Sequence, residues 1–116
     1  MAHILLVDDD PEVLELTGEL LALANHTVAC ADSAQAALAL LAANHNFDAL
    51  VTDHSMPAIT GETLVTRARA LRPNLPCLLM TGYGDSVDIT IDVRVLRKPF
   101  RATILHAAIN DILADP

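Results

Sequence analysis

The chain has 116 residues, carries a formal net charge of −8 and is 53% hydrophobic. That length suits one domain over residues 1–116 with one hydrophobic core. The acidic balance argues against direct nucleic-acid binding, which needs a basic surface to replace counterions. No apolar run is long enough to cross a bilayer and no signal peptide precedes the first one, so we expect a cytoplasmic protein without membrane insertion.

Short apolar runs alternate along the chain with segments of helical periodicity. The apolar runs predict strands at residues 4–7, 27–31, 50–52, 77–80 and 93–97. The periodic segments predict helices at residues 11–24, 34–44, 62–72 and 104–113. Residues 83–92 are less regular and have room for only a short or irregular helix, which would be the fourth of five in chain order.

Local signals mark where the helices begin and which sides face inward. Asp10, directly before Pro11, is predicted to cap the first helix, and Ser33 the second. The apolar stripes that should face the core include Leu16 in the first helix and Ile104 in the last. Alternating strands and helices imply right-handed βαβ units, and hence an α/β fold with a parallel sheet covered on both faces.

The two cysteines, Cys30 and Cys77, lack the spacing of a metal site or of a redox motif. We therefore expect two buried free thiols, in keeping with a reducing compartment. Neither cysteine is expected to contribute a metal ligand or a disulfide.

Polar side chains stand where the apolar runs end. Asp8 and Asp9 follow the first run, Asp53 the third, Thr81 the fourth and Lys98 the fifth. The carboxyl ends of parallel strands share one edge of a sheet, so these side chains should converge. Three clustered carboxylates repel one another, which favours a hard divalent cation such as Mg²⁺. A phosphoryl group at Asp53 would meet positive charge on two sides, and an aspartate can act as its acceptor.

Four motifs occur in order, each at a predicted strand end. They are Ile4-Leu5-Leu6-Val7-Asp8-Asp9-Asp10, Val51-Thr52-Asp53-His54-Ser55-Met56-Pro57 followed by Gly61, Met80-Thr81-Gly82 and Lys98-Pro99-Phe100. Together they make the chain similar, over essentially its whole length, to the receiver domains of two-component response regulators. The resemblance implies a flavodoxin-like, doubly wound sheet of five parallel strands in the order 2-1-3-4-5.

The resemblance also implies roles for the acidic residues. Asp53 would accept a phosphoryl group from a histidine kinase or a histidine phosphotransfer protein, and the switched surface would change protein contacts. Asp9, Asp53 and the main-chain carbonyl of Ser55 would bind Mg²⁺ directly, and Asp8 would act largely through water. Such a domain is not an enzyme in the usual sense, because it catalyses only its own phosphorylation and dephosphorylation.

Further roles fall on residues beyond the acidic cluster. Lys98 would pair with the phosphoryl oxygens, and its peptide bond to Pro99 is typically cis in such domains. Thr81 would bond a phosphoryl oxygen in the activated state. Tyr83 and Ser55 stand at positions that would tune the lifetime of the phosphoryl group.

Two features depart from the family pattern. Val95 occupies the position, three residues before the lysine, where many receivers carry an aromatic switch residue, so that switch cannot operate as such. The connection from Thr81 to Lys98 is short, which leaves at most a weak homodimer through its helix. Residues 80–83 and 95–100 resemble the receivers of hybrid sensor kinases more than those of transcription factors. We therefore expect a hybrid-kinase receiver or a single-domain regulator.

Three other classes of protein remain as alternatives. A degenerate receiver would act as a docking module independent of phosphorylation. An aspartyl-phosphate phosphatase would carry a second acid two residues after the acceptor, where Ser55 stands. A flavodoxin would need a phosphate-cradling loop where the three acids stand, and they would repel the flavin phosphate. His54, beside the acceptor, is expected to face solvent.

Overall fold

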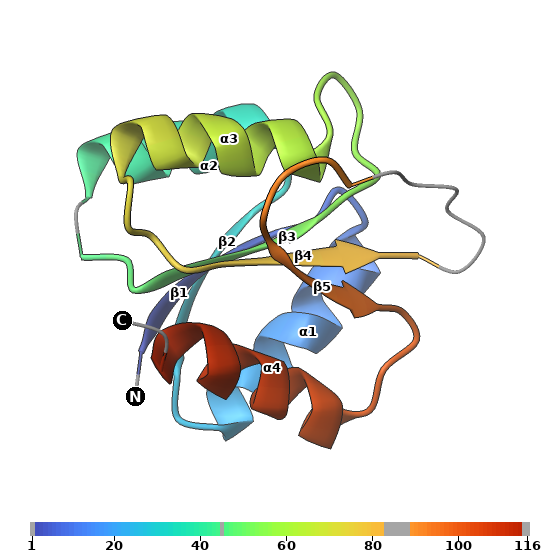
Figure 1. The fold of residues 1–116 in the computed structure, drawn as a ribbon. Helices are drawn as coiled ribbons and strands as arrows, with labels where there is room; N and C mark the ends of the chain where they lie inside the picture. The colour runs from blue at the N-terminus through green and yellow to red at the C-terminus, as the bar shows by residue number, and fades with distance from the viewer. Residues whose placement is uncertain (1, 45, 83–88, 115–116) are drawn as a thin grey trace.

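A parallel sheet of five strands lies at the centre of the computed structural model, which describes residues 2–44, 46–82 and 89–114 (Figure 1). The strands follow the order β2-β1-β3-β4-β5, which confirms the predicted topology. Their bounds are β1 His3–Val7, β2 Thr27–Ala31, β3 Ala49–Asp53, β4 Cys77–Thr81 and β5 Arg94–Arg97. The three inner strands are the most apolar because helices cover both of their faces.

Within the described ranges, four helices cover the sheet, two on each face (Figure 1). Their bounds are α1 Pro11–Leu23, α2 Ala34–Ala43, α3 Gly61–Leu71 and α4 Ala102–Ala114. Helices α1 and α4 pack with side chains such as Leu6 and Met80, whereas α2 and α3 pack with Leu5 and Leu50. Alternation along each strand therefore divides the core into two layers.

The predicted caps are present at the first two helices. The Asp10 side chain accepts a hydrogen bond from the backbone N–H of Glu12 at 3.0 Å, and Ser33 Oγ accepts one from Ala36 at 3.1 Å. Each bond satisfies a donor that the helix itself leaves unpaired. These caps fix where α1 leaves the end of β1 and where α2 leaves the end of β2.

Some predictions about burial were wrong. Leu16 is 61% exposed and Ile104 is 51% exposed, because each helix contacts the sheet along a narrower stripe than the apolar periodicity marks. Cys77 is buried as expected, but Cys30 is exposed. Cys30 lies on β2, an edge strand, and Gly18 of α1 beside it has no side chain to cover the thiol.

Residues 82–93 connect β4 to β5. Residues 89–93 form no helix, and residues 83–88, where the rest of the predicted short helix would fall, lie outside the described residues. Ile91 and Val93 still pack against the α2 and α3 layer. None of the helices in the described ranges is long and apolar enough to cross a bilayer.

Candidate functional site

The strand register brings the predicted site residues to one edge of the sheet. Val7 is level with Thr52, Asp53 with Met80, and Thr81 with Arg97. Asp8 and Lys98 each follow directly after a strand that ends at this edge. The convergence predicted from the strand ends is therefore present in the fold.

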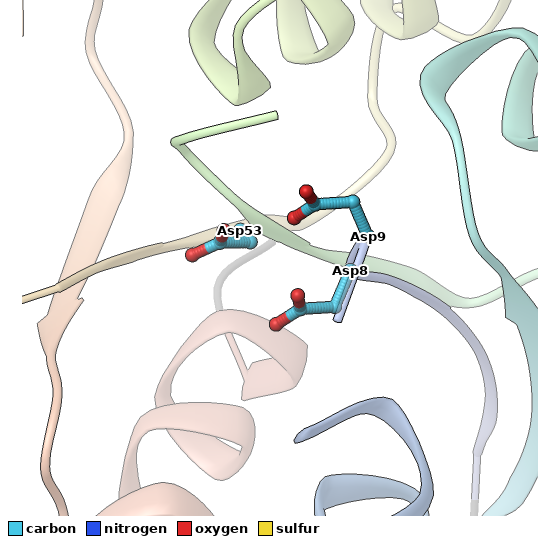
Figure 2. Close-up of side chains that lie close together, drawn as sticks. All are labelled: Asp8, Asp9 and Asp53. Atoms are coloured by element: carbon cyan, nitrogen blue, oxygen red, sulfur yellow. The ribbon is translucent and has the colours of Figure 1, made fainter. Parts of the chain in front are cut away.

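Three carboxylates form the centre of this edge (Figure 2). Oxygen atoms of Asp8, Asp9 and Asp53 all lie within 4.8 Å of one another. Asp8 is 1% exposed and Asp53 is 6% exposed, whereas Asp9 is open to solvent. The cluster offers only hard oxygen donors, one of them at the surface, which is the ligand set that Mg²⁺ prefers.

One ammonium group bridges the two buried acids. Nζ of Lys98 lies 3.1 Å from Oδ2 of Asp8 and 3.0 Å from Oδ1 of Asp53. The backbone N–H of Lys98 donates to the carbonyl of Thr81 at 2.7 Å, and the peptide bond to Pro99 is cis, as expected. Lys98 is therefore held from the main chain as well as by its charge.

Burial and charge shift the protonation of this pair. Desolvation raises the pKa of Asp53 above 3.8, with help from the charges of Asp8 and Asp9, and the bond to Lys98 only partly opposes it. Burial alone lowers the pKa of Lys98, but bonds and charges from Asp53 and Asp8 together raise it above 10.5. Lys98 therefore stays protonated over a wider pH range than a free lysine. The ionised form of Asp53 is disfavoured by burial, and further positive charge nearby would stabilise it.

Asp8 is also tied to the start of α1. Its Oδ1 accepts a hydrogen bond from the backbone N–H of Asp10 at 2.9 Å, and its own N–H donates to the carbonyl of Ala31 at 3.2 Å. With Oδ2 on Lys98, both oxygens of Asp8 have protein partners. Asp8 is thus a fixed anchor for the ammonium group, whereas Asp9 beside it is free to adjust in solvent.

The loop after β3 packs unusually close to the acceptor. The backbone N–H of Gly61 donates to the carbonyl of His54 at 2.8 Å, and that of His54 donates to Met80 at 2.8 Å. A Cβ at position 61 would collide with the carbonyl oxygen of Asp53 and would lie 2.7 Å from Cδ1 of Leu79. Only glycine lets the start of α3 lie this close to the main chain of Asp53. The sequence motif contained Gly61 but did not indicate this reason for it.

The first turn of α3 is also tied to the connection before β5. Oε1 of Glu62 accepts hydrogen bonds from the backbone N–H of Thr90 at 2.8 Å and from its Oγ1 at 2.7 Å. These bonds hold the pKa of Glu62 below 4.5. The contact links the loop that follows Asp53 to the segment that leads into β5, and nothing local in the sequence indicated it.

The other predicted site residues lie at varied positions. Thr81 is buried at the end of β4, Ser55 is exposed in the loop after Asp53, and Val95 on β5 is 36% exposed. Tyr83 lies outside the described residues. His54, expected to face solvent, is instead half-buried, and its Nδ1 is shielded without a hydrogen-bond partner among the described residues.

Replacing Asp53 by asparagine should stabilise the metal-free protein near neutral pH. Because the folded protein raises the pKa of Asp53, the stability linked to this group is present below its ordinary pKa of 3.8 and is lost as the pH rises through the raised value. Asparagine does not ionise and has no such loss, so Asp53→Asn should raise the Tm by a few degrees. A gain of about 1 kcal/mol in the free energy of unfolding raises the Tm by roughly 4–8 °C in a domain slightly smaller than this one.

Thermal denaturation in a chelator at several pH values measures this effect. The difference between Asp53→Asn and the wild type should shrink as the pH falls through the raised pKa of Asp53, and it should vanish below the ordinary pKa of 3.8. A variant that is less stable than the wild type near neutral pH would show that the bond to Lys98 outweighs the burial of the charge.

Comparison with known proteins places the chain in a family. The sequence profile of the response regulator receiver domain matches residues 4–110. The chain is 38% identical over 110 residues to the response regulator protein FleR of Pseudomonas aeruginosa, covering 90% of this chain and 23% of FleR. It is 34% identical over 117 residues to the transcriptional regulatory protein FixJ of Bradyrhizobium diazoefficiens, covering 96% of this chain and 56% of FixJ.

The fold gives the same answer. A crystal structure of a response regulator receiver domain protein from Clostridium thermocellum matches with a TM-score of 0.89 at 28% identity, covering 97% of this chain and 94% of that one. The chain spans only 23% of FleR and 56% of FixJ. The expected closeness to receivers of hybrid kinases stays a prediction, since FleR and FixJ are named as a response regulator and a transcriptional regulator. The chain belongs to the response regulator receiver domain family.

Proposed function

We propose that residues 1–116 form one phosphoacceptor domain of a two-component phosphorelay, with Asp53 as the acceptor. The observation that supports this most is the arrangement of Asp53, which is buried among two further acids and bridged by Lys98 at 3.0 Å. Receiver domains are signalling domains rather than enzymes with a separate substrate. The donor would be the phosphohistidine of a histidine kinase or of a histidine phosphotransfer protein.

In the proposed reaction a carboxylate oxygen of Asp53 attacks the phosphorus atom of the donor. The new P–O bond forms as the P–N bond to histidine breaks, and the imidazole leaves with the electron pair and takes up a proton. Lys98 is placed to turn from the carboxylate of Asp53 to the oxygens of the arriving phosphoryl group, while Asp8 keeps it at the site. Such positioning and charge neutralisation supply most of the catalysis in phosphoryl transfer.

Asp8, Asp9 and Asp53 are the residues that would hold Mg²⁺, with the main-chain carbonyl of Ser55 as a further proposed ligand. The cluster of hard oxygen donors and the raised pKa of Asp53 both fit a small divalent cation. When bound, Mg²⁺ would neutralise charge on the acids and on the phosphoryl oxygens.

Thr81 would report the phosphoryl group to the rest of the domain. It is buried at the end of β4 and its carbonyl accepts the bond from the backbone of Lys98. We propose that Thr81 turns its hydroxyl to the phosphoryl oxygens. Val95 then repacks in response to this movement, by a smaller change than an aromatic ring at that position would make. Tyr83 and Ser55 remain proposed tuners of the lifetime of the phosphoryl group.

Incubation with acetyl phosphate and Mg²⁺, followed by intact-mass measurement, tests the proposal. We expect one phosphoryl adduct, which is lost in a chelator and in Asp53→Asn. Asp48→Asn, at the other end of the third strand and exposed, is the matched control and should still label. No adduct, under conditions where another receiver labels, would support a docking module that works without phosphorylation.

A further inference from the structure

The charges of this chain are divided along the sequence. All seven lysine and arginine residues come after residue 66, whereas ten of the fifteen acids come before it. The strand order places β2 and β1 at one side of the sheet and β4 and β5 at the other. The fold therefore places acids along α1 and arginines along β5 and the start of α4, where one arginine, Arg94, also pairs with Asp111 at 3.5 Å.

The acidic surface is the outer side of α1. Residues three, four and seven positions apart share one side of a helix. All five members are exposed, and two of them are large apolar side chains, Leu16 at 61% and Leu23 at 79% exposure. We call this surface the acidic face, and it comprises Glu12, Glu15, Leu16, Glu19 and Leu23.

The basic surface runs along the opposite edge strand and into the start of α4. Its members are also exposed, and two of them are again apolar, Val95 at 36% and Ile104 at 51% exposure. Four of the six exposed large apolar side chains in the described ranges thus belong to these two surfaces. We call the second surface the basic edge, and it comprises Arg94, Val95, Arg97, Arg101 and Ile104.

We propose that the acidic face of one copy of this chain docks on the basic edge of a second copy. The two surfaces are complementary in charge. Each also contains two exposed apolar side chains that the contact would cover. A two-fold pairing through either surface alone would set like charges against each other. Arginines along β5 also disfavour strand-to-strand pairing at this edge, so the contact is made by side chains.

This contact is heterologous, because each copy offers a different surface to its neighbour. Both surfaces remain available at the ends of a pair, so association continues beyond two copies as the concentration rises. Exposed charges carry much of the attraction, so salt weakens it. The proposal does not depend on phosphorylation and can fail while the role of Asp53 stands.

Sedimentation equilibrium of the unphosphorylated protein at several concentrations and two salt concentrations tests the contact. The weight-average mass should rise past that of a dimer in low salt and fall toward that of the monomer in high salt. Arg97→Glu and Glu15→Arg should each weaken association by about tenfold or more, which corresponds to the loss of one close charge pair. Arg67→Glu and Asp48→Arg, exposed residues outside both surfaces, are the matched controls and should associate like the wild type.

Mixing the two surface variants separates this contact from a general charge effect. Arg97→Glu alone and Glu15→Arg alone should be largely monomeric, and an equimolar mixture should associate again because each reversed surface finds its complement. Circular dichroism of each variant confirms the fold. A monomer at every concentration, a mass that stops at two copies, or a mixture that stays monomeric would each overturn the proposal.

Discussion

Lys98→Met is expected to destabilise the metal-free protein by about 3 kcal/mol, because it leaves two buried carboxylates without a cation. Nζ of Lys98 is the group that contacts both Asp8 and Asp53, and methionine keeps much of the apolar stem. Removing one partner of a buried ion pair costs roughly 3–5 kcal/mol, and the 23% exposure of the lysine side chain favours the lower end.

Denaturation with urea, with and without Mg²⁺, measures this cost and its cause. Mg²⁺ should recover more stability in Lys98→Met than in the wild type, because the variant has a larger uncompensated negative charge. Arg101→Met removes an exposed cation from the same connection and should change stability little. Equal stability of Lys98→Met and wild type in chelator would mean that solvent, and not Lys98, balances the acids.

Gly61→Ala should destabilise the protein by about 2–3 kcal/mol, near the upper end of the overpacking range. The added methyl group would meet the carbonyl oxygen of Asp53, which is main chain of a central strand and cannot turn aside. Either the start of α3 or the end of β3 must shift. The acceptor carboxylate would move with it, so labelling by acetyl phosphate should slow as well.

Gly18→Ala is the matched control for this substitution. Gly18 is also a helical glycine, but a methyl group there would lie 3.7 Å from Sγ of Cys30 and 3.8 Å from Cδ2 of Leu6, which is ordinary contact. Alanine in a helix interior is favoured over glycine by roughly 0.5–1 kcal/mol. Urea denaturation should therefore move in opposite directions for the two variants, and two shifts of the same sign would contradict the close approach at Gly61.

Much of the fold could be predicted from local patterns. The apolar runs marked all five strands, and Asp10 and Ser33 marked the starts of two helices, because the signals for these features lie within a few residues. The convergence of Asp53 and Lys98 followed from the rule that parallel strands share their carboxyl edge. Their separation in sequence therefore did not hide the contact.

Other features depend on distances that a sequence pattern does not contain. The exposure of Leu16 depends on how α1 is rotated against the sheet, which periodicity fixes only to within a broad stripe. The bonds from Thr90 to Glu62 join segments 28 residues apart without any local signal. The need for glycine at position 61 arises from the main chain of Asp53, and only the folded loop shows it.

Locating the phosphoryl group on the chain distinguishes Asp53 from the two neighbouring acids as the acceptor. The protein is labelled with acetyl phosphate and Mg²⁺, and borohydride is then used to reduce the acyl phosphate to the alcohol, which turns a phosphorylated aspartate into homoserine. Peptide mass spectrometry should find homoserine at position 53 and aspartate at positions 8 and 9. Homoserine at Asp8 or Asp9, with position 53 unchanged, would show that Asp53 is not the acceptor.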